Sequence, residues 1–321
     1  RRKTRDDSKS RQSRVNLDFS NIKVLLIGDF MIDHYIIGTS NRMSPEAPVP
    51  IVIPEQEYSI PGGAGNVAMN LSLMGANVTC VGCIGDDDWG KKLISILKNE
   101  GINIEAINII NNHPTTLKQR IYSDGKQVAR LDTEKIIDWQ PGSEMKHDYS
   151  DYDIIILSDY NKGVLNHPWF SMNNLDNVIV DPKKNTLSHY SQANIITPNL
   201  NELQRASKIE INDDKSLVNA CNELIQECNF NYIIAKKGNK GMTIVGKNNF
   251  VKHIEAHSVE NPDVTGAGDT VIAALSLAFA KTKDIKISTT IANAAAAVVV
   301  GKPGTATVTI DEINNYISID E

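Results

Sequence analysis

The sequence has little cysteine and no long apolar run. Four cysteines in 321 residues are too few for a disulfide-stapled scaffold. Cys80 and Cys83 form a CxxC pair, but residues three apart on a strand point to opposite faces, so a shared metal or redox role is not expected. No stretch of 18 apolar residues predicts a membrane span. These absences indicate a soluble protein in the reducing cytoplasm.

An excess of positive charge is also lacking. The chain has 33 basic and 39 acidic residues, a formal net charge of −6, which gives no general attraction to nucleic acid. Residues 1–20 are mostly polar and charged, without the apolar core of a signal peptide. We expect a disordered tail there, with a docking arm for an acidic partner as the alternative. Residues 21–321 are then expected to form one large domain.

Two nucleotide-binding motifs are absent. No G-x-G-x-x-G follows the first predicted strand, which argues against a dinucleotide-binding dehydrogenase. The stretch "GDDDWGKK" (85–92) nearly forms a P-loop, but Lys92 stands where the magnesium-binding hydroxyl is needed. Its three aspartates would also repel phosphate.

Apolar runs alternating with amphipathic stretches are what the sequence does contain. They predict an α/β fold, a three-layer sandwich with a mainly parallel sheet. Ligands bind such sheets beyond the carboxyl ends of the strands. The expected strands are 22–28, 77–85, 153–158, 177–181, 193–199 and 231–238, and the expected helices lie within 61–76, 89–101 and 216–228.

Two further segments, 34–53 and 115–132, read as β excursions from the main sheet. Three prolines between residues 45 and 50 exclude a helix in the first. Asp124-Gly125 predicts a hairpin turn in the second. We expect the two segments to pair into a small β lid.

The stretch "NPDVTGAGDT" (261–270) carries the strongest chemical signal. Amides of a Gly-Ala-Gly turn at the start of a helix form a site for an anion, such as a phosphoryl group being transferred. Asp269 beside it would repel that anion but could accept the proton of an attacking hydroxyl. The alternative is an aspartate that only caps the helix.

Here the sequence resembles the ribokinase-like, or pfkB, carbohydrate kinases. "DVTGAGDT" matches their C-terminal signature and "PGGAGNVAMNLSLMGA" (61–76) their N-terminal one. The resemblance is nearest to bacterial D-glycero-β-D-manno-heptose 7-phosphate kinases, including the kinase part of bifunctional heptose kinase and nucleotide-sugar synthases. It is carried by "LSDYNKG" (157–163), "VDPKK" (180–184), "TPNLNE" (197–202) and "ANAAAAVVVGKPGT" (292–305).

The resemblance implies roles for individual residues. Asp269 matches the catalytic base, and Gly266, Ala267 and Gly268 match the anion hole. Asn199 and Glu202 match the N-x-x-E element that helps to place Mg²⁺, through water, and the nucleotide phosphates; a solvated helix charge is the alternative for Glu202. The remaining nucleotide-side residues are Lys237, Gly238, Gly241 and Asn293.

For the sugar, the resemblance implies that Asp33 binds hydroxyls and that Gly62, Gly63 and Asn66 form the turn closing on them. A substrate already phosphorylated at carbon 7 needs a basic anchor away from the reaction centre. The candidates, each of which could instead be a surface charge, are Arg42, Lys118, Arg120, Lys162 and Lys183.

The implied reaction is transfer of phosphate from Mg-ATP to the anomeric hydroxyl of D-glycero-D-manno-heptose 7-phosphate, within ADP-heptose and lipopolysaccharide core biosynthesis. A requirement for a monovalent cation stays open. So do two alternatives: a kinase for ribose, fructose 1-phosphate or another sugar, and a non-catalytic sugar-phosphate-binding protein of the same fold. A homodimer through the lid is expected, with no nucleic-acid or membrane partner.

Overall fold

The larger of two sheets forms the centre of the domain. The computed structural model describes residues 17–141, 149–166 and 175–317. The strands of this sheet are β1 (Lys23–Gly28), β4 (Asn77–Gly85), β5 (Asn103–Ile110), β8 (Ile154–Ser158), β9 (Val178–Asp181), β10 (Ile195–Ile196), β11 (Tyr232–Lys236), β12 (Met242–Gly246) and β13 (Phe250–Ile254). Their order is β13-β12-β11-β10-β9-β8-β1-β4-β5. Among these strands only β12 pairs antiparallel, with β11 and with β13, so the predicted mainly parallel sheet is confirmed.

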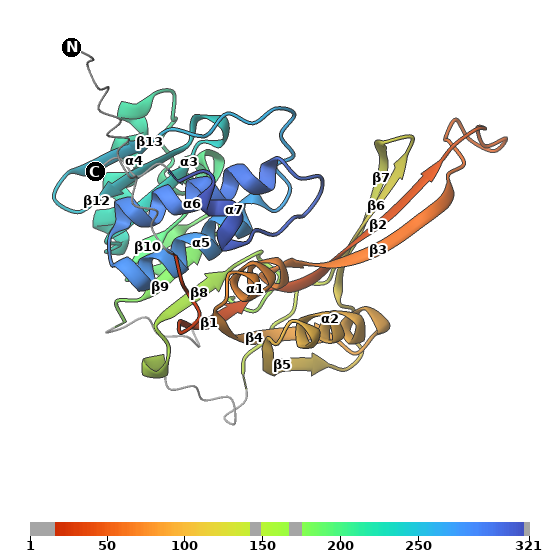
Figure 1. Ribbon diagram of the computed structural model, residues 1–321, viewed down its shortest axis with the longest axis horizontal. Helices are drawn as coiled ribbons and strands as arrows, with labels where there is room; N and C mark the ends of the chain where they lie inside the picture. Colours follow the sequence, from red (N-terminus) through yellow and green to blue (C-terminus); the bar gives the residue numbers. More distant parts are fainter. Residues whose placement is uncertain (1–16, 142–148, 167–174, 318–321) are drawn as a thin grey trace, which may run out of the picture.

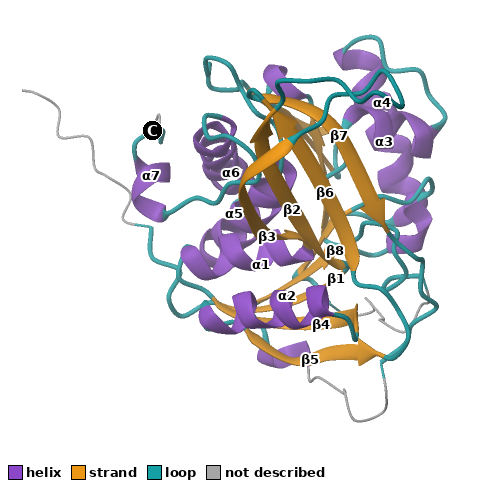
Figure 2. Ribbon diagram, turned by 90° about the vertical axis from the view of Figure 1, so that its right-hand side faces the viewer, coloured by secondary structure: helices purple, strands orange, loops and turns teal. Residues whose placement is uncertain are grey.

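Helices cover both faces of this sheet (Figure 2). They are α1 (Ala64–Leu73), α2 (Asp88–Asn99), α3 (Leu200–Ser207), α4 (Asp214–Cys228), α5 (Ala267–Thr282), α6 (Ile285–Val300) and α7 (Ile310–Asn314). Because side chains alternate along a strand, Val24 and Leu26 of β1 enter a core shared with α1, α5 and α6. Leu25 and Ile27 enter a second core, shared with α3 and α4. This confirms the three-layer sandwich.

The smaller sheet projects from the helical body (Figure 1). It consists of β2 (Phe30–Thr39), β3 (Ile53–Gly63), β6 (Thr116–Ser123) and β7 (Lys126–Thr133), in the order β3-β2-β6-β7. The segments 34–53 and 115–132 both contribute to it. Gly62 and Gly63 end strand β3, so the turn expected around them is wrong; the chain passes directly from this strand into α1.

The start of the described chain is packed rather than free. A disordered tail was predicted for residues 1–20. Residues 1–16 lie outside the described residues, and residues 17–20 are described. Leu17 and Phe19 are only 7% and 1% exposed, so the last residues of that range belong to the core and the expectation was wrong for them. Their apolar side chains bury against the domain, which removes them from water.

The four cysteines are buried free thiols. Burial raises the pKa of Cys83 and of Cys221 to about 12, so these thiols stay protonated and unreactive. Within the described residues, no helix is both long and apolar enough to cross a membrane.

Candidate active site

The N-terminus of α5 faces the carboxyl ends of the parallel strands, the edge at which ligands were predicted. Gly266 precedes the helix in the left-handed conformation, with φ 75°, and no side chain caps the helix amides. A side chain on Gly266 would strain this turn and would place a Cβ 2.9 Å from Asn66 Nδ2. The uncapped first turn therefore leaves peptide N–H groups and the positive end of the helix dipole available to an anion.

Asp269 lies in this first turn and is 5% exposed. Asn66 Nδ2 donates a hydrogen bond to its Oδ2 at 2.8 Å, and the Tyr160 hydroxyl donates to its Oδ1. Burial raises the pKa of Asp269 to about 6, while the two hydrogen bonds oppose that rise because they favour the charged form. A carboxylate with this pKa is ionised at neutral pH and can still take up a proton, as a general base must.

Asn66 holds Asp269 from helix α1. Its own oxygens accept from Asn70 Nδ2, at 2.9 Å for the carbonyl and 3.3 Å for Oδ1. Asn70 Oδ1 in turn accepts from the Thr270 hydroxyl at 3.2 Å. This buried network joins α1 to α5 and holds the Asp269 carboxylate against α1.

Asp33 lies on β2, at the base of the small sheet, and is 6% exposed. Its Oδ1 accepts from Arg120 at 2.8 Å, and the Thr305 hydroxyl lies 3.4 Å from its Oδ2. A Cβ added to Gly62 would lie 2.7 Å from this Oδ2. The glycine therefore gives β3 room to pass the carboxylate, and Arg120 is bound to Asp33 instead of being free for a phosphate.

Two lysine–carboxylate pairs lie near the N-terminus of α5, at the carboxyl ends of β9 and β11. Lys183 Nζ lies 2.6 Å from Glu202 Oε1, and Lys236 Nζ lies 2.5 Å from Asp181 Oδ1. A Cβ on Gly268 would be 3.7 Å from Lys236 Nζ, so this ammonium stands beside the anion-binding turn. The sequence interpretation placed the segment 236–243 on the nucleotide side but selected the next residue, Lys237, and not Lys236.

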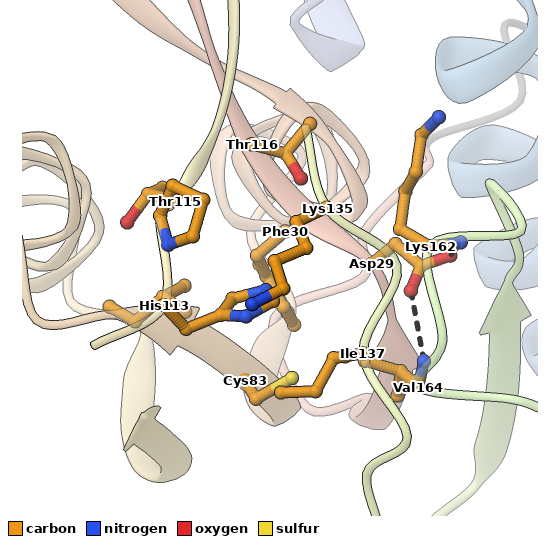
Figure 3. Close-up of a pocket in the computed structure, with 12 residues that line it drawn as sticks. Asp29, Phe30, Cys83, His113, Thr115, Thr116, Lys135, Ile137, Lys162 and Val164 are labelled. Carbon is orange, nitrogen blue, oxygen red and sulfur yellow. Dashed lines mark hydrogen bonds between the residues drawn. The ribbon is translucent and has the colours of Figure 1, made fainter. Parts of the chain in front are cut away.

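Lys118 differs from the paired candidates Arg120, Lys162 and Lys183. Within the described ranges its ammonium forms no ion pair, although it faces the Tyr160 ring at 5.4 Å from the centroid. Burial lowers its pKa, and Asp33 opposes that effect. Lys162 is instead paired with Glu134 at 2.6 Å and lines a small side pocket of about 20 Å³ (Figure 3). Arg42 is exposed, on the segment between β2 and β3.

Asn199 and Glu202 form a capping box at the start of α3. Asn199 Oδ1 accepts from the Glu202 amide at 2.9 Å, and Glu202 Oε2 accepts from the Asn199 amide at 2.8 Å. Glu202 is only 2% exposed, so the alternative of a solvated helix charge is wrong. The spacing N-x-x-E thus has a local structural reason, whatever else it does.

Magnesium fits this carboxylate only through water. In the part of the chain that the structure describes, no three His, Cys, Asp or Glu side chains converge on a metal position. The Glu202 oxygens already accept from Lys183 and from the Asn199 amide. A Mg²⁺ ion brought with nucleotide phosphates keeps several waters, and one of these could use the remaining lone pairs of Glu202.

A separate cavity of about 640 Å³ lies beside α3 and the loop that follows β11. Lys237 lines it and pairs with Asp214 at 2.9 Å. Gly238 and Gly241 turn this loop with φ values of 60° and 81°. Asn293 of α6 donates to the carbonyl of Glu255, which also lines the cavity, at 2.7 Å. Of the four predicted nucleotide-side residues, Lys237 thus lines the cavity, the two glycines shape the loop that lines it, and Asn293 bonds to a lining residue.

Tyr160 is the second residue that the sequence interpretation missed. It belongs to "LSDYNKG", the motif in which Lys162 was the predicted site residue. Its position directly after β8, at the ligand-binding edge of the sheet, was the signal that could have identified it.

Comparison with known proteins places these residues in context. A sequence profile of the pfkB family carbohydrate kinases matches residues 21–312. The bifunctional protein HldE of Aliarcobacter butzleri is 40% identical over 307 residues; the match covers 92% of this chain and 64% of that protein, so the chain spans less than two thirds of it.

Solved structures show the same fold. Arabidopsis thaliana ribokinase, complexed with ribose and ATP, has a TM-score of 0.74 at 19% identity, over 93% of this chain and 99% of its own. Thermotoga maritima ribokinase has a TM-score of 0.73 at 22% identity, over 92% and 99%. The predicted ribokinase-like fold is confirmed, and at these identities the likeness extends to the fold alone.

Proposed function

The chain belongs to the pfkB family of carbohydrate kinases, and on this premise we propose that it transfers the γ-phosphoryl group of ATP to the anomeric hydroxyl of D-glycero-D-manno-heptose 7-phosphate. The products are ADP and the 1,7-bisphosphate. The observation that carries the proposal is the buried carboxylate of Asp269 in the uncapped first turn of α5. The motif resemblance to heptose 7-phosphate kinases supports the choice of sugar.

Each part of the site has a role in this reaction. Asp33 accepts hydrogen bonds from sugar hydroxyls and orients the anomeric oxygen toward Asp269. Asp269 accepts the proton of that hydroxyl as its oxygen bonds to the γ-phosphorus and the bond from phosphorus to the ADP oxygen breaks. The amides of the predicted anion hole, Gly266, Ala267 and Gly268, with the ammonium of Lys236, stabilise the charge on the phosphoryl group in transit.

The nucleotide is proposed to occupy the 640 Å³ cavity, with its phosphates directed toward α5. Lys237 and Asn293 would hold it there. Magnesium would neutralise part of the phosphate charge, with Glu202 and Asn199 holding its waters. The small sheet acts as a lid in this proposal and excludes water, so that ATP is not hydrolysed.

The phosphate already on the sugar is proposed to bind Lys118. Arg120, Lys162 and Lys183 are each matched by a carboxylate at 2.8, 2.6 and 2.6 Å. Lys118 is half-buried and has no such partner in the described ranges, and an unpaired charge that is partly desolvated is stabilised when a counter-ion arrives. This favours a phosphorylated acceptor over ribose.

A panel of acceptors tests the proposal. ADP release would be followed with heptose 7-phosphate, unphosphorylated heptose, ribose and fructose 1-phosphate, and ³¹P NMR would locate the new phosphate. We expect the highest kcat/KM with heptose 7-phosphate and a product phosphorylated at the anomeric carbon. An Asp269→Asn sample purified in parallel controls for contaminating kinases. Preference for another sugar would refute the substrate, and ATP-dependent turnover of none would refute kinase activity.

A further inference from the structure

We propose that Tyr160 is a positioning residue for the base: its hydroxyl fixes the orientation of the Asp269 carboxylate and holds it in the ionised form. This inference rests on the proposed role of Asp269. Tyr160 donates to Oδ1 and Asn66 donates to Oδ2 at 2.8 Å, so each oxygen has one fixed donor. A carboxylate has about four acceptor positions, which leaves places for the proton of the sugar hydroxyl.

The loop that carries Tyr160 is held by a buried carboxylate. Asp29 Oδ2 accepts from the amides of Tyr160 at 2.8 Å and Lys162 at 3.0 Å. Asp29 Oδ1 accepts from the amide of Val164 at 3.1 Å (Figure 3). Burial raises the pKa of Asp29, and these three amides oppose the rise. A buried charge is retained in a core when several amides satisfy it, and here those amides all belong to one loop. Asp29 therefore fastens the loop to the end of β1.

A second carboxylate holds the same loop from the other side. The amide of Asn161 donates to Asp159 Oδ1 at 2.6 Å, and the Tyr190 hydroxyl donates to Asp159 Oδ2 at 2.6 Å. Asn161 and Gly163 have φ values of 57° and 128°, which few other residues adopt without strain. The backbone of Tyr160 is therefore fixed on both sides, as a residue that positions another one requires.

Cations also confine the Tyr160 ring. Lys118 Nζ and Lys183 Nζ lie 5.4 and 5.8 Å from its centroid. Burial and the neighbouring Asp269 carboxylate raise the pKa of the phenol well above its ordinary value. The hydroxyl therefore remains a donor at every working pH, and it favours the charged form of its acceptor.

Several charges face Asp269, and Tyr160 acts among them. Burial is the largest influence on the Asp269 pKa and raises it, and Asp181 adds to the rise; Tyr160, Asn66 and Lys236 lower it. The titratable groups that face the carboxylate from the surrounding elements are Lys118 on β6, Tyr160 after β8, Asp181 and Lys183 at and after β9, and Lys236 on β11. Asp33 on β2 acts on two of these groups, Lys118 and Tyr160. Loss of the Tyr160 donor should raise the pKa of Asp269 from about 6 into the neutral range.

The test is Tyr160→Phe, with Tyr190→Phe as the matched control. Both substitutions remove one phenol that donates to a buried carboxylate, but only the first donates to Asp269. In protein labelled with ¹³C at the aspartate carboxyls, the resonance missing from Asp269→Asn identifies Asp269. We expect its titration midpoint to rise by about one pH unit in Tyr160→Phe and by clearly less in Tyr190→Phe, which loosens the same loop but keeps the Tyr160 phenol.

Kinetics give a second readout. A general base works when deprotonated, so a higher pKa moves the acid limb of kcat/KM to higher pH. With Tyr160→Phe we expect this shift, a fall in kcat of about ten-fold or more at pH 7, and an unchanged KM for the sugar. Asp29→Asn, which loosens the loop but keeps the phenol, should shift the limb in the same direction by less, and it serves if Tyr160→Phe does not fold.

Two outcomes overturn the inference. An unmoved Asp269 midpoint in Tyr160→Phe would show that the hydroxyl does not control the carboxylate. A lower KM for the sugar with unchanged kcat would show that Tyr160 merely fills the acceptor's place and leaves when sugar binds. Absence of kinase activity in the wild type would refute the proposed function instead, and the carboxyl titration would still report on Tyr160.

Discussion

Asp269 shows at the scale of one residue how a position proposed for catalysis opposes stability. Its carboxylate is buried at the mouth of α5 with a pKa raised to about 6 from 3.8. A carboxyl group whose pKa is raised by folding binds its proton more tightly in the folded state. Its contribution to stability is therefore present below pH 4 and is lost as the pH rises through 6. The ionised Asp269 thus lowers the stability of the fold at neutral pH, at the position where a charge is proposed to accept a proton.

Asp269→Asn should accordingly stabilise the protein at alkaline pH. A rise of about two pKa units corresponds to about 3 kcal/mol, so the free energy of unfolding at pH 8 should increase by up to that amount. At pH 4, where the folded wild type already carries the proton, the difference between the two proteins should nearly vanish. Urea unfolding at both pH values measures this. A variant that is less stable at pH 8, or equally more stable at both values, would contradict the assigned cause.

Lys118→Met tests the second residue on which substrate choice depends. The substitution keeps most of the side-chain length but removes the unpaired ammonium beside Tyr160. We expect KM for the sugar phosphate to rise about ten-fold or more, because one charge-assisted contact is lost, with little change for an unphosphorylated sugar. Lys126→Met, at an exposed lysine that begins β7, is the control. Equal effects on phosphorylated and unphosphorylated sugars would refute the assignment.

Helices and strands were predictable where a local pattern determined them. The apolar runs at 22–28 and 77–85 became β1 and β4 because both their faces are covered by helices. Only Ile195–Ile196 of the run 193–199 pairs as a strand, since Asn199 already caps α3. The motif at 261–270 predicted that Asp269 follows a glycine turn at the start of a helix, and Asp269 does lie in the first turn of α5 after Gly266.

Contacts between distant segments could not be predicted in the same way. Tyr160 and Asp269 are 109 positions apart, and no period or spacing connects them. Lys236 and Lys237 are neighbours in sequence, but only the register at the end of β11 decides that Lys236 reaches Asp181 while Lys237 reaches Asp214. Likewise, the sequence does not show that Arg120, Lys162 and Lys183 each pair with a carboxylate while Lys118 has no such pair in the described ranges.

The close approach of β3 to β2 gives a prediction about how these strands meet. Gly62→Ala would put a methyl group 2.7 Å from Asp33 Oδ2 and displace the carboxylate that is proposed to bind the sugar. We expect KM for the sugar to rise about ten-fold or more while nucleotide affinity is kept, measured by kinetics and calorimetry. Gly301→Ala, where no atom lies closer than 3.5 Å, is the control. An unchanged KM for the sugar in Gly62→Ala would indicate that the Asp33 carboxylate does not bind the sugar.

The whole molecule consists of a helical sandwich and a sheet that extends from it (Figure 1). Strands β3 and β7 form the edges of that smaller sheet, and each edge leaves backbone groups without a neighbouring strand. Apolar side chains on it are also exposed, with Val128 at 42%, Leu131 at 51% and Ile53 at 48%. We propose that a second copy of the chain covers this surface and closes each site with its partner's sheet.

Light scattering after size exclusion tests this association. The wild type should have a mass twice that of one chain at micromolar concentration, and the double variant Val128→Lys with Leu131→Lys should have the mass of one chain. Val251→Lys changes an equally exposed valine on β13 of the other sheet and should not alter the mass. A monomeric wild type, or a double variant that still dimerises, would contradict the proposal.

The most direct measurement concerns the turnover of Asp269→Asn with its two substrates bound. If the first turn of α5 stabilises the moving phosphoryl group while Asp269 takes the proton, kcat should fall by about 10²-fold to 10⁴-fold. The dissociation constants for the sugar phosphate and for a non-hydrolysable ATP analogue should change by no more than a few-fold, because neither is proposed to bind through that carboxylate. A variant that keeps near-normal kcat, or that loses activity only because its substrates no longer bind, would contradict the account.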